Sequence, residues 1–200
     1  LRALAGIDPP AKGRVRVLNQ QLPGASVEEW RHLRTRVSYV GQDTVLLNHL
    51  DCLRNVMFPA LYHGLGEAQE VERRARRIIE SLELTHYSDA MPADIGEVQR
   101  RLLVLARALV TDPKVLFLDR PLAGSDRLAF LSLYNRLRDL EARRQICLVW
   151  SSDELAMVRE SSESVLFVSR GRTVRFDSFE AMRDSGLPEV RWFLAQAGES

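Results

Sequence analysis

The pattern of apolar and polar positions along the chain predicts short strands that alternate with helices. Short segments that are continuously apolar or that alternate with a period of two predict strands; these are 13–19, 36–42, 115–119, 146–150, 164–171 and 173–177. Segments with apolar residues three or four positions apart predict helices; these are 26–33, 68–84, 97–110, 127–144 and 153–161. This alternation favours a parallel sheet covered by helices on both faces.

Two of the predicted helices carry additional signals. In the segment 68–84 one stripe holds apolar residues and the opposite face holds Glu and Arg; the stripe consists of Val71, Ala75, Ile78 and Leu82. In the segment 26–33, Ser26 and Glu29 have the spacing of a capping box, so Ser26 is the expected N-cap.

The first residues, 1–6, have the pattern of a helix end that is stopped by Gly6 and by the Asp-Pro-Pro sequence at 8–10. The chain begins within this pattern and without Met. We therefore expect the start of this helix to lie upstream of Leu1.

The pattern of apolar and polar positions changes at Asp43. From there to about Val110 nearly every segment has a helical pattern. This predicts a helical subdomain, 43–110, inserted into an α/β core. The core would consist of 1–42 and 111–200, with 179–200 as a C-terminal helical tail.

Composition narrows the functional classes. The 200 residues suit one domain with a small insertion, and the net charge of +1 gives no field that favours nucleic acid as a partner. Cys52 and Cys147 match no metal-binding spacing and are predicted to be reduced thiols of the core. No apolar run approaches the ~18 residues that a membrane-spanning helix needs, so we expect any membrane association to go through a partner.

The end of the segment 115–119 is the first candidate for chemistry. A buried strand that delivers a carboxylate, here Asp119, to its C-terminal end is suited to holding a metal ion beside a phosphate. The next residue is Arg120, where a nucleotide hydrolase would need a second carboxylate. A guanidinium cannot act as a base at neutral pH.

Several short motifs follow one another in a specific order: Gln42 at a strand end, "IGEVQRRLLVLARAL" at 95–109, "VLFLD" at 115–119, "LAGSD" at 122–126 and "LVWSSDE" at 148–154. This order resembles the nucleotide-binding domain of ATP-binding-cassette (ABC) transporters over nearly the whole chain. The resemblance implies an α/β fold of the P-loop NTPase type, with a parallel sheet core and an inserted helical subdomain. It also implies ATP and Mg²⁺ as cofactors, and a P-loop immediately upstream of "LRALAG" at 1–6, outside this chain.

The resemblance assigns roles to individual residues. Gln42 matches the Q-loop residue, whose amide reaches Mg²⁺ or the attacking water; the alternative is an ordinary polar residue at a strand end. Asp119 matches the Walker B aspartate, which holds Mg²⁺ through its water shell. Asp126 matches the D-loop aspartate, in a loop that crosses the dimer interface.

The helix that opens near residue 95 matches the family's signature motif but departs from it. Gly96 stands in the place of the serine, and Glu97 and Val98 stand in the places of the two glycines. A carboxylate and a β-branched side chain at a helix N-terminus oppose the approach of a phosphate, so we expect this motif to bind ATP poorly. The alternative is an acidic first turn that merely suits the helix dipole.

The residues at the two catalytic positions also differ from those of the family. Arg120 replaces the catalytic Glu and Ser152 replaces the switch His of the family, and losing a general base typically costs about 10²–10⁴ in rate. Arg120 could bind terminal phosphates or pair with a nearby acid, and Ser151 could simply cap the helix at 153–161. These departures together predict weak or absent ATP hydrolysis.

The function that the resemblance implies is that of an ATP-binding subunit, cytoplasmic and peripheral on the inner membrane face. Its partners would be a permease, contacted through 43–60, and a second nucleotide-binding subunit. The alternatives are a scaffold or regulatory pseudo-ATPase that binds no nucleotide, and a soluble ABC protein without a permease.

The segment 179–200 resembles the C-terminal end of the ATPases of Mla-type phospholipid transporters. The matching residues are Pro188, Val190, Arg191, Phe193 and Leu194. This branch would imply lipid transport and a tail that takes part in subunit contacts. The alternative is an amphipathic helix that closes its own domain.

Overall fold

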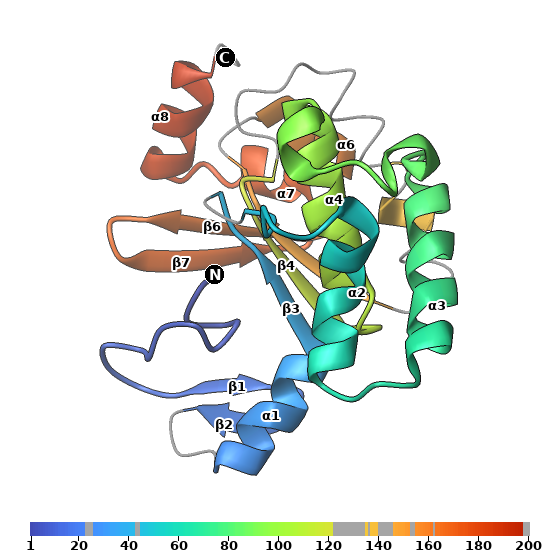
Figure 1. Cartoon of the computed structure of the whole chain (residues 1–200). Coiled ribbons are helices and arrows are strands. Elements are labelled where there is room, and N and C mark those ends of the chain that lie inside the picture. Colours follow the sequence, from blue (N-terminus) through green and yellow to red (C-terminus); the bar gives the residue numbers. More distant parts are fainter. Residues whose placement is uncertain are drawn as a thin grey trace. The chain divides into compact units, whose positions relative to one another are not determined.

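The computed structural model describes residues 1–22, 26–42, 45–121, 135, 137–139, 146–152, 155–161 and 163–197. They form two compact units, Leu1–Ser151 and Ser152–Ser200, and Figure 1 labels most of their helices and strands. The predicted helix at 127–144 lies mostly outside the described residues. The division of the chain into a core and an inserted helical subdomain stays a prediction.

A parallel sheet of three strands forms the centre of the first unit, as predicted. Its order is β3 (Val37–Val40), β4 (Val115–Asp119) and β5 (Cys147–Ser151), and Figure 1 shows β3 and β4 side by side. The first four residues of β4 are buried, as expected of a central parallel strand. The C-terminal ends of the three strands therefore lie along one edge of the sheet.

Helices fill most of the segment 45–109, also as predicted. They are α2 (Cys52–Tyr62), α3 (Ala68–Ser81), α4 (Glu97–Leu109) and the short 3-10 turns Thr85–Tyr87 and Pro92–Asp94. In Figure 1, α2 packs against α3 and α4. All four residues of the predicted stripe are buried: Val71, Ala75 and Ile78 in α3, and Leu82 at its C-cap.

The capping box expected at Ser26 is present at the start of α1 (Val27–Arg36). The Ser26 hydroxyl accepts a hydrogen bond from the Glu29 N–H at 3.2 Å, and the Glu29 carboxylate accepts one from the Ser26 N–H at 2.6 Å. The helix runs beyond the predicted end at residue 33, up to the first strand of the parallel sheet.

The N-terminal residues end a helical turn at Gly6, as expected. The Ala5 N–H lies 2.9 Å from the Leu1 carbonyl oxygen and the Ile7 N–H 2.9 Å from that of Arg2, and Gly6 has φ at 70°, which together form a Schellman motif. The strand expected at 13–19 is half of an antiparallel hairpin, β1 (Val15–Val17) with β2 (Gln20–Leu22). The two turn residues between these strands have φ values of 48° and 66°, as in a type I′ turn.

The last two predicted strands do not join the parallel sheet. β6 (Val165–Ser169) and β7 (Arg172–Phe176) pair with each other in an antiparallel hairpin. Arg170 and Gly171 connect them with φ values of 46° and 75°, which again fits a two-residue type I′ turn. The prediction that these segments are parallel strands was wrong, because two residues cannot form the crossover that parallel strands require.

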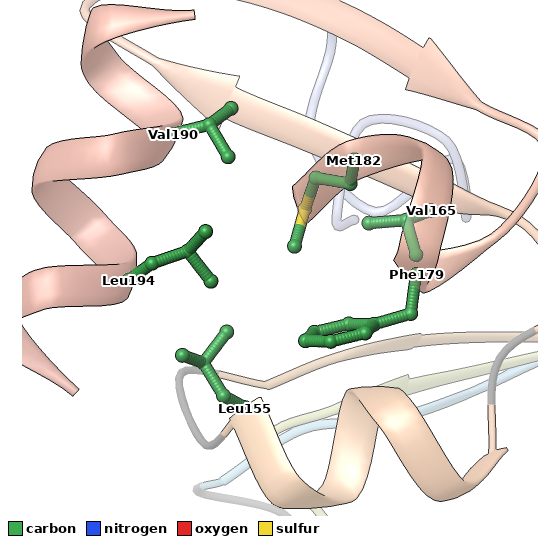
Figure 2. Packing of buried hydrophobic residues seen from close by; sticks show 6 residues of the cluster. All are labelled: Leu155, Val165, Phe179, Met182, Val190 and Leu194. Carbon is green, nitrogen blue, oxygen red and sulfur yellow. The ribbon is translucent and has the colours of Figure 1, made fainter. Parts of the chain in front are cut away.

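The second unit has its own apolar core. It contains α6 (Leu155–Ser161), α7 (Phe179–Arg183) and α8 (Pro188–Gln196), so the tail predicted at 179–200 consists of two helices. Figure 2 shows the buried side chains of this core pointing toward one another; they are Leu155, Val165, Phe179, Met182, Val190 and Leu194.

The two cysteines differ in environment. Cys52 is buried in α2, as predicted, whereas Cys147 is exposed at the start of β5. The expectation of two core thiols was therefore wrong for Cys147. Burial and the neighbouring Asp51 raise the pKa of the Cys52 thiol to about 11, so this thiol is protonated and unreactive at neutral pH.

Candidate nucleotide and metal site

Asp119 lies at the C-terminal end of β4, where the buried apolar strand delivers its carboxylate to the edge of the sheet. Both carboxylate oxygens accept hydrogen bonds from the neighbouring strands. Ser151, at the end of β5, donates from its hydroxyl to Oδ1 at 2.7 Å. Tyr39, in β3, donates from its phenol to Oδ2 at 2.9 Å.

These hydrogen bonds set the charge of the carboxylate. The Ser151 hydroxyl is the main cause of a lowered pKa for Asp119, which burial opposes and the Tyr39 hydroxyl and Arg120 reinforce. Asp119 is therefore an anion at neutral pH. Burial and the neighbouring Asp119 raise the pKa of Tyr39, so the phenol keeps its proton and acts as the donor.

Arg120 begins the turn after β4 in the left-handed region, with φ at 48°. Its backbone N–H donates to the Ser151 hydroxyl at 3.0 Å, and its side chain is exposed. Ser151 therefore accepts from Arg120 and donates to Asp119. Ser151 is the last residue of β5. Residues 153 and 154, where the predicted helix 153–161 would begin, lie outside the described residues, so the alternative that Ser151 caps this helix stays a prediction.

Gln42 lies in the turn that follows β3 and is exposed. Since Val40 pairs with Leu118 in the parallel register, the chain leaves β3 at the same sheet edge that carries Asp119. The structure thus places the predicted Q-loop residue and the predicted Walker B residue at one edge. The chemical role of Gln42 stays a prediction.

Gly96 is the N-cap of α4, with an extended backbone and no side-chain cap. Glu97 in the first turn pairs with Arg101 one turn later, N to O at 2.5 Å, so its negative charge is partly balanced. Val98, in the first turn of α4, is 48% exposed. Arg100 donates to the Ile95 carbonyl oxygen at 2.5 Å and so fixes the chain that leads into this helix.

Two predicted site residues cannot be compared with this geometry. Asp126 and the rest of the D-loop motif lie outside the described residues. Ser152 is the first residue of the second unit and is half-buried. Their roles stay predictions.

The residues present fit an Mg²⁺ ion that arrives with a nucleotide. In the described part of the chain, no three His, Cys, Asp or Glu side chains gather as a metal cage. Mg²⁺ is commonly held by one or two carboxylates together with substrate phosphates and water. Asp119 offers such a carboxylate, because each oxygen accepts one hydrogen bond and keeps a further lone pair.

Sequence reasoning missed two residues of this site. Ser151 was considered only as a helix cap, and Tyr39 was not singled out at all. Tyr39 is 80 positions away from Asp119 along the chain, so only the pairing of β3 with β4 brings them together. The one available signal was that both segments were predicted as strands of the same sheet.

Comparisons with known proteins identify the family of the chain. A family model described as ABC transporter matches residues 1–123. The molybdate/tungstate import ATP-binding protein WtpC of Archaeoglobus fulgidus is 30% identical over 197 residues, which are 98% of this chain and 78% of that protein. The sulfate/thiosulfate import ATP-binding protein CysA of Nephroselmis olivacea is 27% identical, and the methionine import ATP-binding protein MetN of Latilactobacillus sakei is 25% identical. The chain spans 55% of the length of each of these two.

Solved structures show the same fold. Two dimeric structures of the ATP-binding cassette MJ0796, one of them in a post-hydrolysis state bound to ADP and Pi, superpose with TM-scores of 0.77 and 0.78. The sequence identities are 21% and 20%, and the superposition covers 88% of this chain and 78% of each of those chains. The fold is thus that of the ABC ATPase cassettes, and since the family model matches more than half of the residues, the chain belongs to the ABC transporter family.

Proposed function

We propose that this chain is an ATP-binding subunit of an ABC transporter that binds Mg²⁺ and ATP but hydrolyses ATP weakly. The observation that carries the proposal is at the end of β4. There the Asp119 carboxylate is held ionised by hydroxyls from both neighbouring strands, while the next residue is the exposed Arg120 instead of an acid.

The nucleotide-side residues are Asp119, Gln42 and Gly96, with Asp126 of the D-loop as a further member. Mg²⁺, when bound, neutralises charge on the β- and γ-phosphates. Asp119 would hold the ion through its water shell, and Gln42 lies at the same sheet edge to assist through its amide oxygen. Gly96 opens α4, whose first N–H groups can donate to a phosphate.

Weak hydrolysis follows from the side chains in the two catalytic positions. Arg120 cannot take a proton from water, although its guanidinium can bind terminal phosphates through two hydrogen bonds. The side chain of Ser152 is shorter than that of histidine, and its hydroxyl carries no charge. ATP binding would therefore drive closure against a second nucleotide-binding subunit more effectively than turnover would drive opening.

The test is ATP binding and turnover by the full-length protein and by an Arg120→Glu, Ser152→His double variant. The unaltered protein is expected to bind ATP and to turn it over slowly. Restoring the acid and the imidazole should raise the rate by roughly 10²-fold or more, because a general base contributes about 10²–10⁴.

Each single variant serves as a control for the double one. Arg120→Glu alone should recover most of the rate if the base is the missing element, and Ser152→His alone should recover little. Turnover by the unaltered protein at the rate of the double variant would contradict the proposal.

The partners we propose are a permease and a second nucleotide-binding subunit, with the chain peripheral on the cytoplasmic side of the membrane. No helix in the described ranges is long and apolar enough to span a membrane. The expected permease contact, 43–60, carries the exposed apolar side chains of Val45 and Phe58. Leu61 and Tyr62, directly after this segment, are exposed as well. Co-purification of a membrane subunit with the full-length protein would separate this proposal from that of a soluble ABC protein.

For the cargo we propose a lipid, on the basis of the segment 179–200. In α8, Val190 and Leu194 are buried in the unit's own core, which by itself suits a closing helix. Arg191 and Trp192 remain on the outside, and Trp192 is 67% exposed. An exposed tryptophan beside an arginine supports the subunit contact that the Mla-type resemblance implies.

A second candidate function is a scaffold subunit that binds no nucleotide. The observation that favours it is that Glu97 and the exposed Val98 occupy the first turn of α4, where a carboxylate and a β-branched side chain oppose a phosphate. The binding measurement above separates the two candidates, since the scaffold would show no affinity for ATP with or without Mg²⁺.

A further inference from the structure

Tyr39 reaches Asp119 by a path that depends on the sheet register. Tyr39 pairs with Phe117 in the parallel ladder, so its half-buried ring must extend two positions along β4, past Leu118, to bring its hydroxyl to the Asp119 carboxylate at 2.9 Å. Since an ionised carboxylate only accepts, the phenolic proton points to Asp119.

Because Gly41 has no side chain, it leaves room for the ring of Tyr39. A Cβ atom at Gly41 would lie 2.8 Å from Cε1 and 3.0 Å from the hydroxyl oxygen of Tyr39. Real side chains essentially never approach so closely, so any other residue at position 41 would force the ring of Tyr39 aside. The ring therefore lies against the Gly41 backbone, immediately before Gln42.

The hydrogen bonds to Asp119 come from opposite sides. Tyr39 reaches Oδ2 from β3 and Ser151 reaches Oδ1 from β5, so the carboxylate plane has little freedom to rotate. Each oxygen nevertheless keeps a lone pair for a metal-bound water. Outer partners that orient a metal-binding carboxylate in this way commonly affect metal affinity by 10–100-fold.

We propose that Tyr39, directed by Gly41, is a positioning residue that fixes the Asp119 carboxylate for the Mg²⁺ ion of a bound nucleotide. This inference rests on the proposed function, because it needs a nucleotide site at Asp119. Tyr39 acts through Asp119 and does not itself contact the nucleotide. Its hydroxyl orients the Asp119 carboxylate from β3, the strand that leads directly into the Gln42 turn.

The experiment is calorimetric titration of the full-length protein with a non-hydrolysable ATP analogue, once with Mg²⁺ and once with EDTA. Tyr39→Phe keeps the ring and removes only the hydroxyl. It is expected to weaken binding of the Mg²⁺ complex by roughly tenfold and to change the metal-free affinity by less than about twofold. Gly41→Ala should produce the same selective loss, because the added methyl group displaces the ring.

The matched control is Tyr87→Phe, the same chemical change at another half-buried tyrosine, in the 3-10 turn Thr85–Tyr87. It is expected to leave both affinities unchanged. An equal loss with and without Mg²⁺ in Tyr39→Phe would assign the hydroxyl a merely structural role and overturn the inference, as would no loss at all. If the unaltered protein binds neither form of the analogue, the proposed function fails and the inference with it.

Discussion

Asn55 shows how one buried side chain determines the path of the loop between the Gln42 turn and α2. Its side chain is fully buried, and its Oδ1 accepts from the Leu47 N–H at 2.7 Å. Its Nδ2 lies 2.9 Å from the carbonyl oxygens of Leu47 and Leu50. The amide thus supplies the hydrogen bonds that a buried loop backbone would otherwise lack.

Replacing this amide should be costly. Asn55→Leu is expected to lower the free energy of unfolding by about 2–3 kcal/mol, because backbone groups of Leu47 and Leu50 lose their partners in a buried site. Urea unfolding followed by circular dichroism measures the change. Asn48→Leu, at an exposed position of the same loop, is the control and should stay within about 0.5 kcal/mol of the parent. Equal losses in the two variants would contradict a special role for the buried amide.

At the scale of elements, the capping box makes α1 sensitive to acid. Hydrogen bonds from Ser26, chiefly from its backbone N–H, hold the pKa of Glu29 below its usual value of 4.5. Because the pKa is lower in the folded state, this contribution is complete above pH 4.5 and is lost as the pH falls through the folded pKa.

Ser26→Ala removes the hydroxyl that accepts from the Glu29 N–H and is expected to lower Tm by about 2–4 °C at pH 7. The loss should be smaller at a pH below the folded pKa of Glu29, where the carboxyl is protonated and the hydroxyl no longer stabilises its charge. Thermal melts at the two pH values measure the difference. The control is the same substitution in a Glu29→Gln background. Gln keeps the reciprocal hydrogen bond but does not titrate, so the effect of Ser26→Ala should then be the same at both pH values. A pH-dependent effect that survives in the Glu29→Gln background would point to another titrating group.

Elements with a strong local signal could be predicted from the sequence. The stripe of α3, the capping box of α1 and the apolar run of β4 depend on neighbours within a few residues, and all three are present as expected. The hairpin β6–β7 was missed although Arg170 and Gly171 leave room for only a two-residue turn. Short apolar strands suit parallel and antiparallel pairing equally well, so periodicity alone does not decide between them.

The site was predictable only in part, because its geometry depends on contacts between distant strands. Asp119 and Gln42 could be found from motifs that each occupy one stretch of the chain. The hydroxyls of Tyr39 and Ser151 reach Asp119 across 80 and 32 positions, and no local pattern records such a contact. The left-handed backbone of Arg120 is likewise set by the hydrogen bond to Ser151 and not by its own preference.

At the scale of the whole molecule, the two compact units have separate apolar clusters. In Leu1–Ser151 one cluster joins the hairpin β1–β2, α1 and the parallel sheet through Val17, Leu33 and Phe117. In Ser152–Ser200 the cluster of Figure 2 joins α6, β6, α7 and α8. Separate cores allow one part of a chain to lose structure while the other keeps it.

Phe179 offers a direct test of this division. It is 1% exposed, packs within the core of Figure 2, and has the Arg159 guanidinium 5.1 Å from its ring centroid. Phe179→Ala is expected to cost the second unit about 3–5 kcal/mol. Hydrogen exchange in β6, β7 and α8 should then accelerate by roughly 10²–10³-fold or more, while β3 and β4 keep their protection.

The control for this experiment is Leu103→Ala in α4, which is fully buried in the first unit. It should accelerate exchange in α2, α3 and α4 and leave β6 and β7 protected, the reverse of the Phe179→Ala pattern. Equal acceleration of β4 and β6 in either variant would show that the chain unfolds as one cooperative unit. The reciprocal pattern would instead mean that the unit Ser152–Ser200 can lose structure while the strand carrying Asp119 stays folded.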